Sequence, residues 1–144
     1  MEWLSVVIDY GIIGLLVFLS FIAMGIAMER FYFFRNINIE AFPDKTTLEM
    51  ELTKKIHLIA TIGSNAPYIG LLGTVLGIML TFFTIGREGI MDTGKIMSGL
   101  ALALKATAVG LLVAIPSVSL YNFLLRKIKV LLMSWEIVHG RKDV

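Results

Sequence analysis

Hydroxyl groups and one lysine interrupt two long apolar stretches of this 144-residue sequence. The hydroxyls belong to Thr74, Thr81, Thr84 and Thr107. In a helix, a threonine hydroxyl can bond to the carbonyl four residues earlier, or it can offer a hydrogen bond to a pore. Helix packing and a polar pathway through a membrane would both use these residues, and their spacing alone leaves the two interpretations open.

Among these residues, Lys105 has the highest free-energy cost of insertion into a membrane. It lies ten positions after Lys95, about 15 Å along a helix, where a cation costs a few kcal/mol. On a helical wheel it lies opposite Thr107, which disfavours a place on the same face. Its long side chain could snorkel toward the outer interface. Alternatively it forms an intramembrane ion pair, and since no acid lies deep in an apolar stretch, we expect that carboxylate to come from a neighbouring subunit or a partner.

Small residues line one face of each stretch when side chains are placed about 100° apart. The first face holds Gly63, Pro67, Gly70, Gly73, Thr74, Gly77, Thr81 and Thr84. The second holds Gly99, Ala103, Ala106, Thr107, Gly110, Ala114, Ser117 and Tyr121. Small residues let helix backbones approach closely in lipid. We expect helix packing through Gly70, Gly73, Gly77, Ala103, Gly110 and Ala114, with Thr81, Thr84 and Ser117 as further candidates for lining a pore.

The apolar stretches themselves predict an all-α integral membrane protein with three transmembrane helices. The first, Tyr10–Met28, has 19 residues without a charge. Between Lys55 and Arg87 lie 31 residues, and between Lys95 and Arg126 lie 30, with Lys105 as the single charge. About 20 residues suffice to cross a bilayer core of about 30 Å. The second and third helices should therefore be extended and should tilt or project beyond the hydrocarbon.

The distribution of Lys and Arg predicts the orientation. Five fall between the first two stretches, two between the last two and five after the third. Since positive segments remain on the cytoplasmic side, we expect a periplasmic N-terminus and a cytoplasmic C-terminus. The expected order is a first span at about 9–30, a cytoplasmic loop at 31–55, a second span at about 58–86, a periplasmic loop at 87–95, a third span at about 96–125 and a cytoplasmic tail at 126–144, all in a single membrane domain covering residues 1–144.

The two cytoplasmic segments are short. Turn residues around Pro43-Asp44 precede a helix start at Thr46, from which a helix could run straight into the second span. The tail has Ile128, Leu131, Leu132 and Trp135 at helical spacing, which predicts an amphipathic continuation of the third helix. It could anchor at the membrane interface or pack on the first loop.

Several function classes are excluded or disfavoured by composition. The chain is 57% hydrophobic and 17% charged, and its net charge of +2 is too small to suggest nucleic-acid binding. It has no cysteine and two distant histidines, so neither thiol chemistry nor a metal centre is expected. The spans hold no Ser/His pair or aspartate pair for intramembrane proteolysis. We expect no enzymatic activity, no catalytic residues and no cofactor.

Two segments carry a resemblance to a known family. They are NAPYIGLLGTVLGIM at residues 65–79 and ALALKATAVGLLVAIPSVSLYN at residues 101–122. Together with the three-span order and the Glu29-Arg30 pair after the first span, they resemble the MotA/TolQ/ExbB proton-channel family, and within it the ExbB/TolQ branch. The resemblance covers nearly the whole chain.

The resemblance implies a pentamer in the bacterial inner membrane, surrounding single helices of ExbD-like subunits. Proton flow would be coupled to motion of those inner helices, and a TonB-like protein would carry the work to outer-membrane receptors. The family's pore threonines map onto Thr74 and Thr107. Its proton-accepting Asp lies on the ExbD-like helix.

This sequence departs from the family pattern in two places. Members often have a Glu five positions before the second pore threonine, where this chain has Leu102. The first cytoplasmic loop is also much shorter than is usual in the family.

Two other functions remain open. One is a TolQ-type subunit of an envelope-constriction system, which lies within the family. A flagellar stator subunit also lies within the family, but it has four spans and a larger cytoplasmic domain, and this chain has room for neither. A helix-packing subunit without ion conduction would explain the small residues but would leave Lys105 without a role.

Overall fold

The computed structural model describes residues 2–89 and 92–142, which form four α-helices and one short 3-10 helix. The elements are α1 (Glu2–Asn36), η1 (Ile39–Ala41), α2 (Lys45–Leu52), α3 (Ile56–Glu88) and α4 (Thr93–Lys142). Residues 90–91 of the expected periplasmic loop and 143–144 of the expected tail lie outside the described residues.

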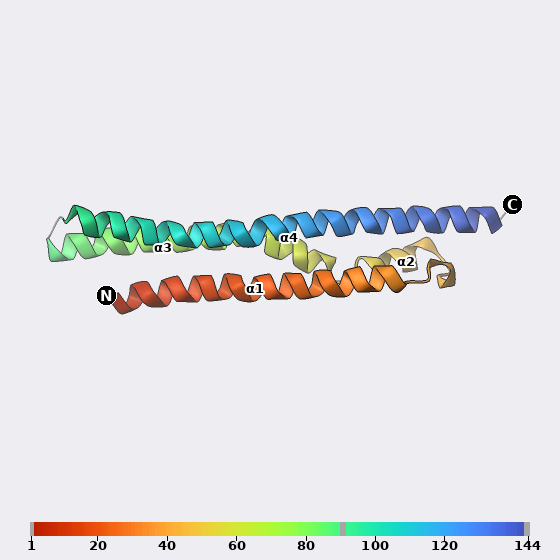
Figure 1. Ribbon diagram of the computed structural model, residues 1–144, viewed down its shortest axis with the longest axis horizontal. Coiled ribbons are helices and arrows are strands. Elements are labelled where there is room, and N and C mark those ends of the chain that lie inside the picture. The colour runs from red at the N-terminus through yellow and green to blue at the C-terminus, as the bar shows by residue number, and fades with distance from the viewer. Residues whose placement is uncertain (1, 90–91, 143–144) are drawn as a thin grey trace.

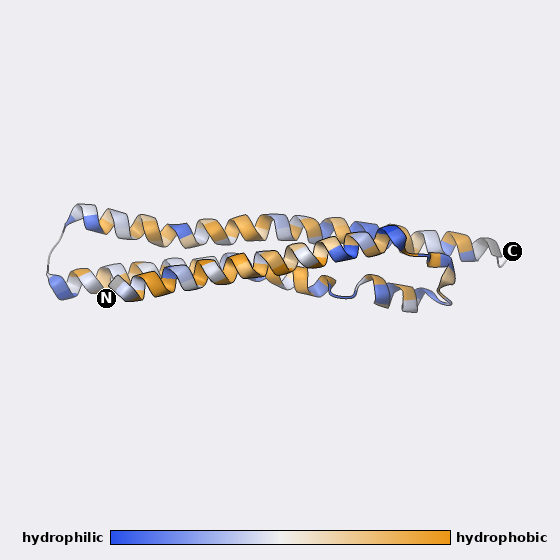
Figure 2. Ribbon diagram, turned by 60° about the horizontal axis from the view of Figure 1, so that its bottom comes forward, coloured by the Kyte–Doolittle hydropathy of each residue, from blue (hydrophilic) through white to orange (hydrophobic). Residues whose placement is uncertain are grey.

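The three long helices lie side by side in an elongated bundle (Figure 1). The start of α1 and the connection between α3 and α4 lie at one end, whereas α2 and the C-terminus lie at the other. Each long helix is apolar enough to cross a membrane, over Trp3–Asn36, Ile56–Glu88 and Thr93–Gly140. Figure 2 shows hydrophobic residues along most of their length. The predicted all-α fold with three long apolar helices is confirmed.

Helices α3 and α4 are longer than a bilayer requires. With 33 and 50 residues, they measure about 50 Å and 75 Å. The tail continues the third helix without a break, as its periodicity predicts, because α4 runs through to Lys142. At least half of α4 must therefore lie outside a hydrocarbon core of about 30 Å.

The first loop contains one helix that sequence reasoning placed well and one boundary that it missed. Asp44 caps α2, since its side chain accepts a hydrogen bond from the Thr47 amide at 2.6 Å. The expectation that this helix runs straight into the second span is wrong. Helix α2 ends at Leu52, and Lys55 has a φ of 68°. A left-handed residue cannot continue a right-handed helix, so α3 starts afresh at Ile56.

The buried side chains form two clusters along the bundle. One joins the three long helices in the apolar region and includes Leu16, Ile62 and Val113. The other joins α1, α3 and α4 to α2, whose Leu48 and Leu52 are fully buried. The short loop therefore has no core of its own and is held by the extensions of the long helices.

The tail packs on the first loop, which decides between the two alternatives that its amphipathic pattern allowed. The Trp135 indole donates a hydrogen bond to the Phe42 carbonyl at 3.1 Å, and Lys45 forms an ion pair with Glu136. Ile128 of α4 is buried in the cluster that contains Leu48.

Candidate functional site

The small-residue faces of α3 and α4 pack against each other at backbone contact distance. A Cβ atom built on Gly70 would lie 2.7 Å from the Ala106 carbonyl oxygen, and one built on Gly110 would lie 2.6 Å from the Ala66 carbonyl oxygen. Neither backbone oxygen can move without moving its helix. These two positions therefore require glycine, and they set the separation of the helices.

The contact continues toward the α3–α4 connection. A Cβ on Gly77 would lie 2.8 Å from the Cβ of Ala103. One on Gly73 would lie 2.7 Å from the Cβ of Ala106 and 3.1 Å from Ile12 Cδ1 of α1. Ala114, also expected at a packing face, is buried in the cluster shared by the three helices. The close approach is thus made within one chain.

This close approach brings Thr74 and Thr107 together. Their hydroxyl oxygens are in hydrogen-bond contact across the two helices. The Thr74 hydroxyl also lies 2.9 Å from the Ala103 carbonyl oxygen and 3.3 Å from that of Gly70. The Thr107 hydroxyl lies 3.4 Å from the Gly70 carbonyl oxygen. Thr74 is 7% exposed, whereas Thr107 is half-buried.

The two hydroxyls have more acceptors within reach than protons to donate. Each carries a single proton and can accept through its lone pairs. When Thr74 donates to Ala103, Thr107 can donate to Thr74; when Thr107 donates to Gly70, Thr74 can donate to Thr107. The donor direction can therefore reverse while the helices stay in place, and the pair offers a polar contact that adapts to a neighbour.

The other hydroxyls named from the sequence serve their own helices. Thr81 donates to the Gly77 carbonyl at 2.9 Å, and Thr84 donates to that of Leu80 at 2.8 Å. Both side chains are half-buried. Ser117 donates to the Val113 carbonyl at 2.7 Å and is 4% exposed. Within the described residues, only Thr74 and Thr107 form threonine hydrogen bonds between two helices.

Lys105 pairs with an acid of the same chain. Its Nζ lies 3.0 Å from Oδ2 of Asp9 on α1. The expectation that the carboxylate would come from another chain is therefore wrong. The side chains of Lys105 and Asp9 are 48% and 24% exposed. They border a groove of about 260 Å³ that is also lined by Leu102 and Thr81.

Sequence reasoning missed Asp9 because it stands just outside the first uncharged stretch, Tyr10–Met28. Helix α1 starts further along the bundle than α4 does (Figure 1), so Asp9 reaches the depth of Lys105. The sequence offered one signal: Lys105 needs a counter-ion, and Asp9 is the acid nearest to the apolar stretches on the same expected side.

The opposite end of α1 carries a buried cation. Arg30 is 4% exposed, pairs with the neighbouring Glu29 at 2.6 Å and donates to the Glu51 carbonyl at 2.8 Å. Its guanidinium also lies 4.5 Å from the centre of the Phe33 ring. Arg30 therefore joins α1 to the end of α2. Within residues 2–89 and 92–142, no group of three or more His, Cys, Asp or Glu could hold a metal ion.

Comparison with known proteins identifies the family. The sequence model of the MotA/TolQ/ExbB proton channel family matches residues 37–137, which include α3, the paired threonines and most of α4. The chain belongs to this family. Among its relatives, "Biopolymer transport protein ExbB" of Aquifex aeolicus is 58% identical over 140 residues, which cover 97% of this chain and 95% of the relative.

Two Helicobacter pylori proteins are also similar over nearly the whole chain. "Putative biopolymer transport protein ExbB-like 2" is 56% identical over 136 residues, covering 94% of this chain and 91% of the relative. "Biopolymer transport protein ExbB" is 46% identical over 138 residues, covering 96% and 95%. The family predicted from the two sequence segments is therefore confirmed.

Proposed function

We propose that this chain is the proton-channel subunit of a TonB–ExbB–ExbD energy-transducing complex, which uses the proton motive force to power TonB-dependent uptake across the outer membrane. Membership of the proton channel family and similarity to biopolymer transport proteins named ExbB support this assignment. The observation that carries it is the Thr74–Thr107 hydroxyl contact at the closest approach of α3 and α4.

The proposed assembly is a pentamer in the bacterial inner membrane around the helices of ExbD-like subunits. Its N-terminus would be periplasmic and its C-terminus cytoplasmic, with spans at about 9–30, 58–86 and 96–125. The basic residues around α2 and the tail support this orientation, since positive segments stay on the cytoplasmic side. Large exposed apolar residues on α3 and α4, such as Leu71, Met79 and Leu112, support contact with lipid or other subunits.

The proposed mechanism uses the threonine pair as an adaptable polar contact. A carboxylate on the partner helix prefers its neutral form in an apolar environment and can ionise beside hydroxyls or water. The half-buried Thr107 hydroxyl would face the partner, with the buried Thr74 hydroxyl bonded behind it. The small-residue faces would let the partner helix turn. Thr81 and Thr84 are further candidates for lining the pore. Ser117 is not proposed to line the pore, because it is buried and its hydroxyl bonds within its own helix, whereas the buried Thr74 hydroxyl bonds to the half-buried Thr107.

In the proposed mechanism, the proton does not pass through side chains of this subunit alone. Leu102 stands where family members often carry a Glu, and an alkyl side chain cannot carry a proton. Asp9, the acid nearest to it in the groove, is already paired with Lys105. The titrating carboxylate is therefore assigned to the ExbD-like partner.

Native mass spectrometry of this chain co-expressed with the ExbD-like protein encoded beside it tests the assignment. We expect five copies of this chain with one or two partner chains. A monomer or dimer that ignores the partner would contradict the proposal and favour a helix-packing subunit, to which the glycine contacts would equally apply. Capture of a Tol-system partner in place of a TonB-like protein would indicate a TolQ-type subunit.

A further inference from the structure

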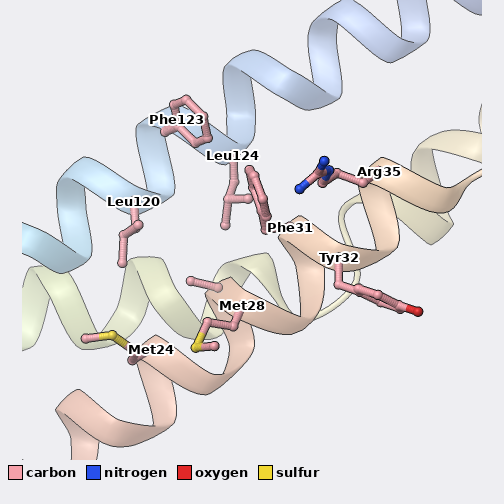
Figure 3. Close-up of a pocket in the computed structure, with 9 residues that line it drawn as sticks. Met24, Met28, Phe31, Tyr32, Arg35, Leu120, Phe123 and Leu124 are labelled. Atoms are coloured by element: carbon pink, nitrogen blue, oxygen red, sulfur yellow. The ribbon is translucent and has the colours of Figure 1, made fainter.

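An apolar groove of about 470 Å³ separates α1 from α4 toward the end of the bundle that carries α2. Figure 3 shows its walls, which are formed by Met24, Met28 and Phe31 on α1 and by Leu120, Phe123 and Leu124 on α4. Met28 is 68% exposed and Phe123 is 50% exposed. The long, flexible methionine side chains can adapt to a ligand of irregular shape.

The groove crosses the level at which the first span is expected to leave the hydrocarbon, at about residue 30. Met24 lies six positions before that level and Arg35 lies five positions beyond it, which is about 9 Å and about 8 Å along the helix. An acyl chain packed against Met24 and Met28 would thus lie in the hydrocarbon, while a headgroup at the level of Arg35 would lie at the membrane surface.

Two cations contact the aromatic walls at one end of the groove, Arg35 as a lining residue and Lys127 beside it. The Lys127 ammonium lies 4.7 Å from the centre of the Phe31 ring and 5.5 Å from that of Phe123. The Arg35 guanidinium lies 5.8 Å from the same Phe31 ring, and Figure 3 shows it turned toward Phe31 while the Tyr32 ring points away. Neither Arg35 nor Lys127 has an ion-pair partner within the part of the chain that the structure describes.

We infer that this groove binds an anionic phospholipid. One acyl chain lies between Met24, Met28 and Leu120, and the phosphate lies between Arg35 and Lys127. The ligand is assigned as a lipid because an acyl chain fits an apolar groove open along its length, while only a charged headgroup supplies the anion that both cations lack. An apolar helix from a second copy would cover the walls but would leave the cations unpaired.

The test is binding of dioleoyl phosphatidylglycerol to the purified full-length chain, followed by native mass spectrometry, with phosphatidylcholine of the same chain length for comparison. We expect preferential retention of phosphatidylglycerol. The double substitution Arg35→Gln/Lys127→Gln should lower the affinity for phosphatidylglycerol at least about tenfold, because the loss of one charge-assisted hydrogen bond worth about 1.5 kcal/mol already has that effect. The matched control Arg87→Gln/Lys129→Gln removes the same charge away from the groove and should retain the lipid.

A second pair of variants tests the apolar walls. Met24→Trp narrows the groove and should weaken binding of both lipids, whereas Met79→Trp, at an exposed methionine on α3, should leave binding unchanged. The inference would be overturned if the wild-type chain retained both lipids equally and if neither Arg35→Gln/Lys127→Gln nor Met24→Trp changed that retention. So would a dimer of this chain that is lost in Met24→Trp, because the groove would then be a contact between copies.

Discussion

The Lys105 ammonium lies 3.0 Å from the Asp9 carboxylate and ties α1 to α4 within the apolar part of the bundle. Each charge lowers the cost of placing the other in a membrane. The pair is partly exposed in the single chain, with Lys105 more exposed than Asp9.

For this pair we expect coupled effects of mutation. Asp9→Asn or Lys105→Gln alone should lower the thermal stability of the assembled protein, because each leaves one charge without its partner. The double variant should recover part of the loss, with a coupling energy of about 0.5–3 kcal/mol. Unfolding followed by fluorescence in detergent measures all four proteins. Strictly additive losses would mean that Lys105 is stabilised by snorkelling and that Asp9 contributes independently.

For the threonine pair we expect Thr74→Val or Thr107→Val to impair function while the complex still assembles. Valine keeps the shape of threonine and removes its hydroxyl. Loss of a hydrogen bond worth about 1–1.4 kcal/mol at the step that moves the proton would reduce proton flux about five- to tenfold. Proton uptake by liposomes that contain the complex measures this effect.

The control for this experiment is Thr61→Val. Thr61 is exposed near the start of α3 and donates to the His57 carbonyl of its own helix at 2.8 Å. The Thr61→Val substitution should have little effect on proton flux. Normal flux in both the Thr74 and Thr107 variants would disprove the role of the hydroxyl pair.

For the glycine contacts we expect Gly110→Ala to separate α3 from α4. The added methyl group would lie 2.6 Å from the Ala66 carbonyl oxygen, so one helix must shift. Overpacking of this kind destabilises by about 1–3 kcal/mol. Gly14→Ala on α1 is the matched control, because nothing lies within 4 Å of its new methyl group. Comparable melting temperatures for the two variants would contradict the requirement for glycine at position 110.

For the α2 cap we expect a specific pH dependence. The hydrogen bond from the Thr47 amide lowers the pKa of Asp44 below its ordinary value of 3.8. A lowered folded-state pKa means that the cap stabilises α2 at pH values above 3.8 and that this contribution is lost as the pH falls through the folded-state pKa. Hydrogen exchange of the α2 amides, corrected for intrinsic rates, should show loss of protection in that range.

Asp44→Asn separates capping from titration, since asparagine caps helices without a charge. In this variant the α2 amides should keep their protection as the pH is lowered. If the wild-type protein and the Asp44→Asn variant lost protection together, acid would be acting elsewhere in the fold.

Local patterns predicted much of this molecule. Long uncharged stretches predict membrane-spanning helices, and the period of 3.6 residues places Gly70 and Gly110 on facing surfaces. The same periodicity extends α4 through the tail. These features depend on neighbours within a few turns of one helix, so they can be read without knowing the fold. The segments around Thr74 and Thr107 likewise sufficed to predict the family.

Only the tertiary structure decided which distant residues meet. The Asp9–Lys105 pair depends on how far α1 is displaced along α4, and the Trp135–Phe42 hydrogen bond depends on where the first loop folds back. The left-handed Lys55 sets that loop's path by interrupting two sequences that each favour a helix. Sliding one apolar helix along another changes few local preferences, and so the sequence alone determined the helices and their faces, while packing of the whole chain determined their register.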